Sequence, residues 1–180
     1  MKKIIFLFIF LFSCSLIHAQ NLLANANSKD ALKKTLDSAL IAEYYVSKDD
    51  AAKILGRPAY LKDSTYKYSG GILRYTFDYL AKKIDTTSKG RIFFGFEQYQ
   101  DAAIAKVTYQ TIKAENEKSS NTSTVPNLGE DAFLQKDNLN QPFLMVLNHD
   151  KIYKLRIFSV TSQQSQEELM KVAKKLVQNH

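Results

Sequence analysis

Alternation between apolar and polar residues marks the strands of this chain. Residues 72–80 and 152–160 alternate most clearly, and residues 91–99 are apolar on both faces over part of their length. Alternation with period two is typical of a half-buried antiparallel strand, whereas a strand that is apolar on both faces is covered on both sides. We therefore expect residues 91–99 near the centre of a sheet. Shorter strand candidates are residues 66–69, 132–135 and 143–147.

Apolar residues at helical spacing predict four helices around these strands. Their starts follow the potential capping residues Ser28, Ser47, Asp101 and Ser165. Ser47 and Ser165 are followed three residues later by Asp50 and Glu168, which is the spacing of a capping box. The predicted packing side of the third helix consists of Ile104, Val107 and Ile112, with Ala103, Tyr109 and Thr111 near them. Because the strands come in hairpin-spaced runs between helices, we expect an antiparallel sheet and an α+β fold.

One seven-residue pattern, Leu-Gly-x-x-Ala-aromatic-Leu, occurs twice, at residues 55–61 and 128–134. Gly56 ends a helical run and precedes Pro58, which suits a left-handed helix cap, whereas Gly129 follows a loop and suits a turn. Each copy is followed by strand-like runs and an amphipathic helix. The pattern therefore predicts one unit used twice, with the order α-βββ-α-βββ-α. The helices then cover either one face of the sheet or both faces.

The first 20 residues have the pattern of an export signal. Lys2 and Lys3 precede an apolar run over residues 4–17, and Ala19 is a small residue suited to cleavage. We expect residues 1–20 to be removed and residues 21–180 to form a single α+β domain of a secreted or periplasmic protein. Alternatively, Leu-Phe-Ser-Cys at residues 11–14 is a loose lipobox, and a lipidated Cys14 would attach the protein to the outer membrane.

Composition narrows the classes of function. Loss of Lys2 and Lys3 lowers the formal net charge from +7 by two, to +5, and the remaining bases are spread along the chain. This spread favours an anionic envelope component or another envelope protein as partner, rather than nucleic acid. Cys14 is the single cysteine, so its removal would exclude thiol chemistry and cysteine-ligated metal. No later apolar run is long enough to cross a membrane.

The second half of the chain resembles a group of small exported bacterial proteins and lipoproteins of uncharacterised function. The resemblance rests on the helix that carries Ala102-Ala103 and Tyr109, on residues 125–133, and on the hairpin and helix over residues 143–177. It implies a PsbP-like α/β/α sandwich.

The first half carries a separate resemblance. Residues 46–79, with Ser47-Lys48-Asp49-Asp50 ahead of Leu55-Gly56-Arg57-Pro58, resemble the repeat of outer-membrane assembly lipoproteins and β-lactamase-inhibitor-like domains. The shared motifs in both halves are helix stops and turns. The resemblance therefore implies a fold and a compartment but no catalytic residue.

Few residues of the sequence suit catalysis. His18 leaves with the signal, His149 lies in a predicted turn and His180 is the last residue, so neither a histidine-based metal site nor a Ser-His-Asp triad is expected. The acidic pairs Asp49-Asp50 and Glu130-Asp131 could bind calcium or act as acid and base. We favour structural roles for both pairs, with the first capping a helix and the second lying in a loop. No catalytic residue, metal or cofactor is predicted.

Candidate binding residues lie on the predicted strands and loops. Arg74, Lys154 and Arg156 share the polar phase of two strands and would form a basic patch for an anionic partner if that face is open. The alternative is a solvated or helix-covered face. The strand aromatics could stack on sugars or line a cleft, although their alternation also suits a core. Ser64 and Thr86 follow aspartates, which resembles the O-glycosylation sites of some exported bacterial proteins.

These observations favour a non-enzymatic exported binding or accessory module of unknown ligand. One alternative is a carboxylate-dependent hydrolase that acts on cell-envelope or carbohydrate substrates, which needs two acidic residues about 5 to 10 Å apart in one pocket. Another alternative is a scaffold or inhibitor-like domain that acts by protein contact. It would show an exposed apolar patch and no deep pocket.

Overall fold

The computed structural model describes residues 45–82, 90–119 and 121–179, which form an α+β fold. Its elements are α2 (Lys48–Leu55), β1 (Ala59–Ser69), β2 (Ile72–Ala81), β3 (Arg91–Tyr99), α3 (Ala102–Glu117), β4 (Thr122–Thr124), β5 (Asp131–Lys136), β6 (Pro142–Asn148), β7 (Lys151–Phe158) and α4 (Gln163–Asn179). The expected signal peptide, the helix predicted after Ser28 and the residue Thr86 lie outside the described residues. The predicted α+β class with an antiparallel sheet is confirmed.

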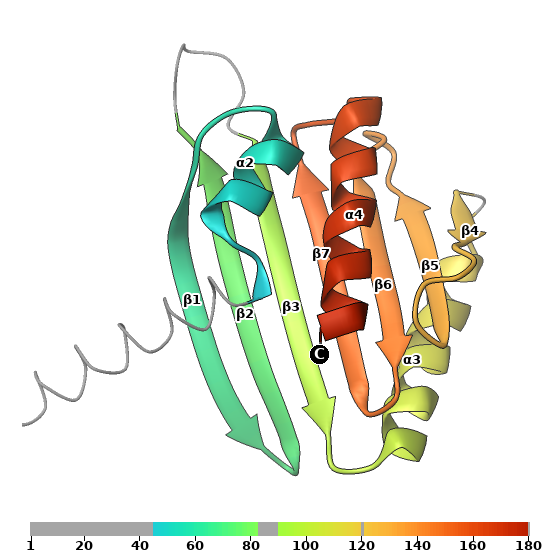
Figure 1. Cartoon of the computed structure of the whole chain (residues 1–180). Coiled ribbons are helices and arrows are strands. Elements are labelled where there is room, and N and C mark those ends of the chain that lie inside the picture. The colour runs from blue at the N-terminus through green and yellow to red at the C-terminus, as the bar shows by residue number, and fades with distance from the viewer. Residues whose placement is uncertain (1–44, 83–89, 120, 180) are drawn as a thin grey trace, which may run out of the picture. The chain divides into compact units, whose positions relative to one another are not determined.

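The strands form one seven-stranded sheet in the order β1-β2-β3-β7-β6-β5-β4 (Figure 1). All neighbouring strands are antiparallel. The first and second halves of the chain meet where β3 pairs with β7, and this register places Phe94 opposite Leu155 and Phe96 opposite Tyr153. The prediction that residues 91–99 form a strand inside the sheet is confirmed.

Helices lie on both faces of the sheet. Helices α2 and α4 cover one face, here called the front face, and α3 lies against the other, the rear face (Figure 1). The front core includes Ile54, Leu55, Phe77, Phe94, Leu155, Leu169 and Leu176. The smaller rear core consists of Tyr99, Ala105, Tyr109, Phe133, Met145, Leu147 and Ile152. Alternation along the strands separates these two sets of side chains, and a bulge between Leu61 and Asp63 interrupts it in β1.

The repeated unit is not confirmed as a structural repeat. The second half has the additional short strand β4 between α3 and β5. Helix α2 precedes the strands of the first half on the front face, whereas α3 precedes those of the second half on the rear face. The two Leu-Gly pairs also differ in role. Gly56 is the left-handed cap of α2, and Gly129 lies in the loop before β5.

Three local predictions from the sequence are wrong. Strand β1 begins at Ala59 rather than Tyr66, because pairing with β2 continues through the polar part of the strand. Helix α3 buries Ala105 and Tyr109, while Ile104 and Val107 are exposed. Ser165 does not cap α4; the helix begins earlier, and the Ser162 hydroxyl accepts a hydrogen bond from the Ser165 backbone N–H at 3.1 Å.

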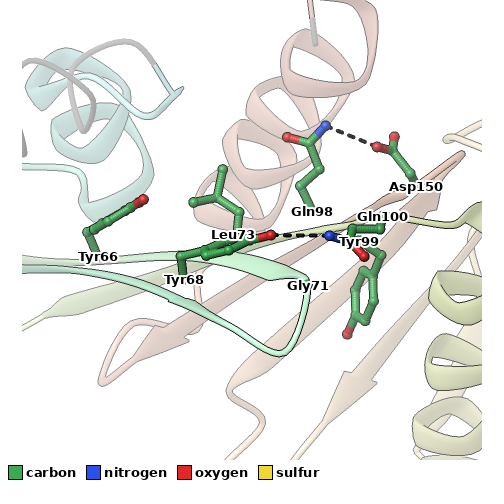
Figure 2. Close-up of a pocket in the computed structure, with 8 residues that line it drawn as sticks. All are labelled: Tyr66, Tyr68, Gly71, Leu73, Gln98, Tyr99, Gln100 and Asp150. Atoms are coloured by element: carbon green, nitrogen blue, oxygen red, sulfur yellow. Dashed lines mark hydrogen bonds between the residues drawn. The ribbon is translucent and has the colours of Figure 1, made fainter.

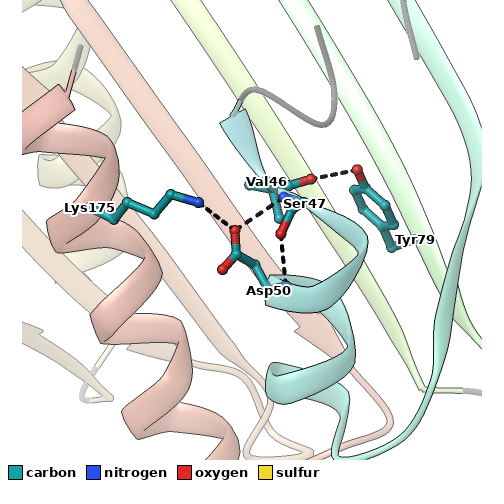
Figure 3. Close-up of polar contacts among 5 residues, drawn as sticks. All are labelled: Val46, Ser47, Asp50, Tyr79 and Lys175. Carbon is teal, nitrogen blue, oxygen red and sulfur yellow. Dashed lines mark hydrogen bonds and ion pairs between the residues drawn. The ribbon is translucent and has the colours of Figure 1, made fainter. Parts of the chain in front are cut away.

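The cap of α2 also joins this helix to α4 (Figure 3). The Ser47 hydroxyl accepts a hydrogen bond from the Asp50 N–H, and the Asp50 carboxylate accepts one from the Ser47 N–H, both at 3.1 Å. The same carboxylate lies 2.7 Å from the Lys175 Nζ. The predicted capping box of α2 is therefore confirmed, and its acidic residue has a second partner on the neighbouring helix.

Replacing Asp50 with Asn should destabilise the protein at neutral pH more than at acid pH. Burial acts to raise the pKa of Asp50, but the hydrogen bonds from Lys175 and Ser47 outweigh it and hold the pKa below 3.8. A lowered folded-state pKa adds stability above the unfolded value, and this stability is lost as the pH falls through the folded value. We expect Asp50→Asn to cost about 1 to 2 kcal/mol at pH 7, with the loss shrinking below about pH 4.

Urea unfolding at neutral and acid pH measures this difference, with Asp49→Asn as the control. Asp49 is exposed in the same first turn of α2. Its replacement by Asn removes the same favourable interaction with the helix dipole but none of the contacts of Asp50. Equal losses for the two variants, or a loss that does not depend on pH, would contradict the proposed role of Asp50.

Alanine should be tolerated far better at Gly56 than at Gly129. Both glycines have positive φ, 67° and 63°, so either substitution costs roughly 1 to 2 kcal/mol of backbone strain. A Cβ at Gly56 would meet no atom within 4 Å, whereas one at Gly129 would overlap the Leu147 carbonyl oxygen and approach a Val146 methyl at 2.8 Å. We expect Gly129→Ala to lose about 3 kcal/mol or more in urea unfolding. Similar losses of unfolding free energy for both variants would show that β6 shifts to accommodate the added methyl group.

Candidate functional site

An open cleft of about 640 Å³ lies at the end of the sheet beside the β1–β2 turn. We call it the tyrosine cleft, and its lining is Tyr66, Tyr68, Gly71, Leu73, Gln98, Tyr99, Gln100 and Asp150 (Figure 2). These residues come from β1, the β1–β2 turn, β2, the end of β3, the loop that follows β3 and the β6–β7 turn. The cleft therefore joins segments that are far apart in the sequence.

The tyrosines of the cleft are exposed because of their place in the hairpin. Tyr66 pairs with Tyr75, and Tyr68 pairs with Leu73, so all four side chains lie on the front face. Tyr66 and Tyr68 are nevertheless 45% and 59% exposed. The Tyr66 ring lies 5.1 Å from the Tyr75 ring, centroid to centroid. Tyr75 in turn lies 6.2 Å from the Phe96 ring, so the exposed rings continue the aromatic core toward solvent.

Polar side chains stand beside these rings. The Gln100 side-chain amide donates a hydrogen bond to the Tyr68 hydroxyl at 3.2 Å, and the Gln98 amide donates one to the Asp150 carboxylate at 3.0 Å (Figure 2). Each glutamine still has a carbonyl oxygen and a second N–H with which to meet a ligand. The cleft thus combines apolar ring surfaces with neutral hydrogen-bonding groups and one carboxylate.

The three predicted basic residues share the rear face but do not form a free patch. Arg74 and Lys154 both contact the Glu97 carboxylate, at 3.2 and 3.0 Å. Arg156 lies 3.2 Å from Asp137 and stacks over the Phe158 ring at 4.9 Å from its centroid. The cationic side chains remain partly accessible, yet each has a carboxylate partner. The three cations thus share two carboxylates, Glu97 and Asp137, so their charge is compensated in part.

Glu97 is held in its charged form by these neighbours. Burial acts to raise the pKa of Glu97, but the Tyr99 hydroxyl, Lys154 and Arg74 outweigh this effect and lower it. Burial and the adjacent carboxylate raise the pKa of Tyr99 to about 12, so its hydroxyl stays protonated and donates to Glu97 at 2.7 Å. In this cluster Arg74 and Lys154 therefore share one carboxylate, which offsets part of their positive charge.

Of the two acidic pairs considered for metal binding or catalysis, Asp49 is exposed and the other three residues have structural partners. Asp50 caps α2, and Asp131 lies 2.8 Å from Lys113 of α3. Glu130 lies 2.8 Å from His149, which occupies the β6–β7 turn with a φ of 54°. No group of three or more potential metal ligands occurs among the described residues. Likewise, none of the described helices is both long and apolar enough to span a membrane.

Ser64, a predicted O-glycosylation site, lies in β1 and not in a loop. Its side chain is half-buried and points to the front face opposite Phe77, and its N–H donates to the Asp63 carboxylate at 2.8 Å. Modification here would require a transferase to reach a side chain that is held on a strand. Thr86 lies outside the described residues.

Sequence reasoning did not find the tyrosine cleft. A signal was present, because Tyr66 and Tyr68 precede the Gly70-Gly71 turn at the same spacing at which Leu73 and Tyr75 follow it. A two-residue turn fixes that register and places the four residues on one face. The contributions of Gln98 and Asp150 depend on the pairing of β3 with β7, which local patterns do not reveal.

Replacing Glu97 with Gln should strengthen binding to a sulfated polysaccharide resin. The substitution removes the carboxylate between Arg74 and Lys154 and leaves several cations on one face. Glu115→Gln loses the same charge at an exposed position of α3 and serves as the control. We expect the Glu97 variant to elute at higher salt, and thermal unfolding checks that both variants are folded. Elution of both variants at the same salt concentration would show that the rear face does not bind polyanions.

No protein-family model, curated protein or solved structure matches this chain. The tyrosine cleft and the surfaces around it are therefore the features from which a function can be inferred.

Proposed function

We propose that this chain is a non-enzymatic exported binding module and that the tyrosine cleft holds its ligand, a neutral carbohydrate. The observation that carries the proposal is the pair of exposed tyrosine rings, Tyr66 and Tyr68, beside the amides of Gln98 and Gln100. The signal-like pattern of residues 1–20 supports export. Binding of glycans would suit a protein outside the cytoplasm.

The cleft fits a sugar for two physical reasons. Tyrosine rings offer a flat apolar surface at low cost in conformational entropy, together with a hydroxyl that bonds to the ligand. Sugar rings have an apolar face of C–H groups and a rim of hydroxyls. Gln98, Gln100 and Asp150 supply donors and acceptors for such a rim. An open cleft also lets a longer chain extend beyond it.

A neutral ligand is favoured over an anionic one by the distribution of charge. The cleft lining contains no lysine or arginine, and its charged member is Asp150. The basic residues Arg74, Lys154 and Arg156 lie on the opposite face and are paired with carboxylates. An anionic envelope component that binds these basic residues would therefore have to compete with the carboxylates of Glu97 and Asp137.

The hydrolase alternative has weaker support. Retaining and inverting glycosidases use two carboxyl groups across the bond that breaks. Asp150 is the single carboxylate in the cleft lining, and it already accepts a hydrogen bond from Gln98. The cleft accordingly offers binding groups without the second carboxylate that this mechanism needs.

A protein-contact function is the second candidate, because α3 exposes apolar side chains. Ile104 and Val107 are 55% and 63% exposed and lie one turn apart on the outer side of α3. Exposed apolar groups at helical spacing are a common docking surface for another protein. A scaffold or inhibitor-like role would use this helix and leave the tyrosine cleft free.

Loss of the Tyr68 ring should weaken carbohydrate binding. Tyr68→Ala removes the most exposed ring of the cleft, and we expect affinity for neutral oligosaccharides to fall about tenfold or more. Tyr60→Ala is the matched control, since Tyr60 is also an exposed tyrosine of β1 but lies on the rear face opposite Leu80. Calorimetric titration of purified protein against neutral oligosaccharides chosen from a glycan array measures the effect. Absence of neutral-glycan binding, or equal losses in the two variants, would refute the proposal.

A further inference from the structure

We infer that β1 is a self-association strand, through which two copies of the chain join antiparallel into one continuous sheet. Strand β1 is the first in the sheet order and is 11 residues long, whereas the opposite edge, β4, has three residues. In the described part of the chain, no strand pairs with its outer side. Such an edge presents a row of backbone donors and acceptors that another strand can use.

The backbone groups that face outward can be assigned from the hairpin. Ser69 and Ile72 flank a two-residue turn in which Gly70 and Gly71 both have positive φ, so these two residues exchange backbone hydrogen bonds. Bonding alternates along an antiparallel pair. The N–H and C=O groups of Ser64, Tyr66 and Tyr68 therefore point away from β2. The hydrogen bond from the Ser64 N–H to the Asp63 carboxylate agrees with this assignment.

Charge complementarity identifies a second copy as the occupant. Asp63 and Lys67 lie on the rear face of β1, two residues on either side of Thr65. A two-fold axis at Thr65 places Asp63 of each copy opposite Lys67 of the other. Opposite charges at directly facing positions stabilise a strand pair, and a two-fold contact contains each pair twice. Within the described residues Lys67 has no carboxylate partner of its own.

The same register uses the outward backbone groups. Ser64 of one copy would face Tyr66 of the other and exchange backbone hydrogen bonds with it. The Ser64 N–H would then leave the Asp63 carboxylate, which becomes available to Lys67 of the second copy. The bulge between Leu61 and Asp63 ends the regular edge on one side, so with the axis at Thr65 the contact is confined to Asp63–Lys67. A contact of this size predicts weak, concentration-dependent association.

Pairing of this kind would also extend the tyrosine cleft. Tyr66 lies on the front face, and the axis at Thr65 makes the Tyr66 side chains of the two copies diagonal neighbours across the new strand pair. Diagonal neighbours are within reach of aromatic side chains. Each copy would then add a ring beside the cleft of the other.

A charge swap tests the inference. Sedimentation velocity over a concentration series up to about 1 mM should show dimer formation by the purified wild-type chain, as expected for a small interface. Lys67→Glu places like charges opposite each other twice, so we expect association to weaken about tenfold or more. The double variant Asp63→Lys, Lys67→Glu restores opposite charges and should restore the dimer. Lys174→Glu makes the same charge change at an exposed position of α4 and should leave association unchanged.

Three results would overturn the inference. The first is a wild-type chain that stays monomeric throughout the series. The second is a failure of the double variant to recover association while its circular dichroism remains native. The third is loss of the dimer in Val107→Glu rather than in Lys67→Glu, which would assign association to α3. None of these readouts depends on a carbohydrate, so they are separate from the test of the tyrosine cleft.

Discussion

The pairing of β3 with β7 is the constraint on which the rest of the structure depends. Within the described part of the chain, it joins the strands of the first half to those of the second. Phe94 and Leu155 meet there under the helices of the front face, and Ile152 of β7 contributes to the rear core. A shift of one residue would turn Phe94 to the rear and bring Glu97 into the front core. Side chains on both faces therefore select this register.

The same pairing explains where the candidate site lies. Helices α2 and α4 pack together over the middle of the front face and are joined by the contact of Asp50 with Lys175. The end of the β1–β2 hairpin lies outside this cover, so Tyr66 and Tyr68 stay accessible although they point to the same face as the core. Gln98 and Asp150 reach the cleft because β3 and the β6–β7 turn are neighbours. The cleft is thus an uncovered margin of the front core.

The sequence predicted features set by local chemistry and missed those set by packing. Alternation identified β2 and β7, apolar residues on both faces identified β3, and the spacing of Ser47 and Asp50 identified the start of α2. Helical periodicity could not tell which side of α3 is buried, because Tyr109 and Val107 both belong to apolar arcs of that helix. The orientation in which α3 packs on the sheet determines that Tyr109 is buried and Val107 is exposed. The basic residues were placed correctly on one face, yet their carboxylate partners come from paired strands and a loop.

The side chains of β1 alternate, so the cleft and the charged residues of the open edge use opposite faces of the same strand. Ser64, Tyr66 and Tyr68 point to the front face, where the tyrosines form one wall of the cleft. Asp63 and Lys67 point to the rear, where they set the charge along the open edge. Substitution on one side leaves the other set of side chains in place. The proposed ligand binding and the proposed self-association therefore depend on different side chains of a single strand, although the backbone groups of the tyrosines lie on the edge that would join two copies.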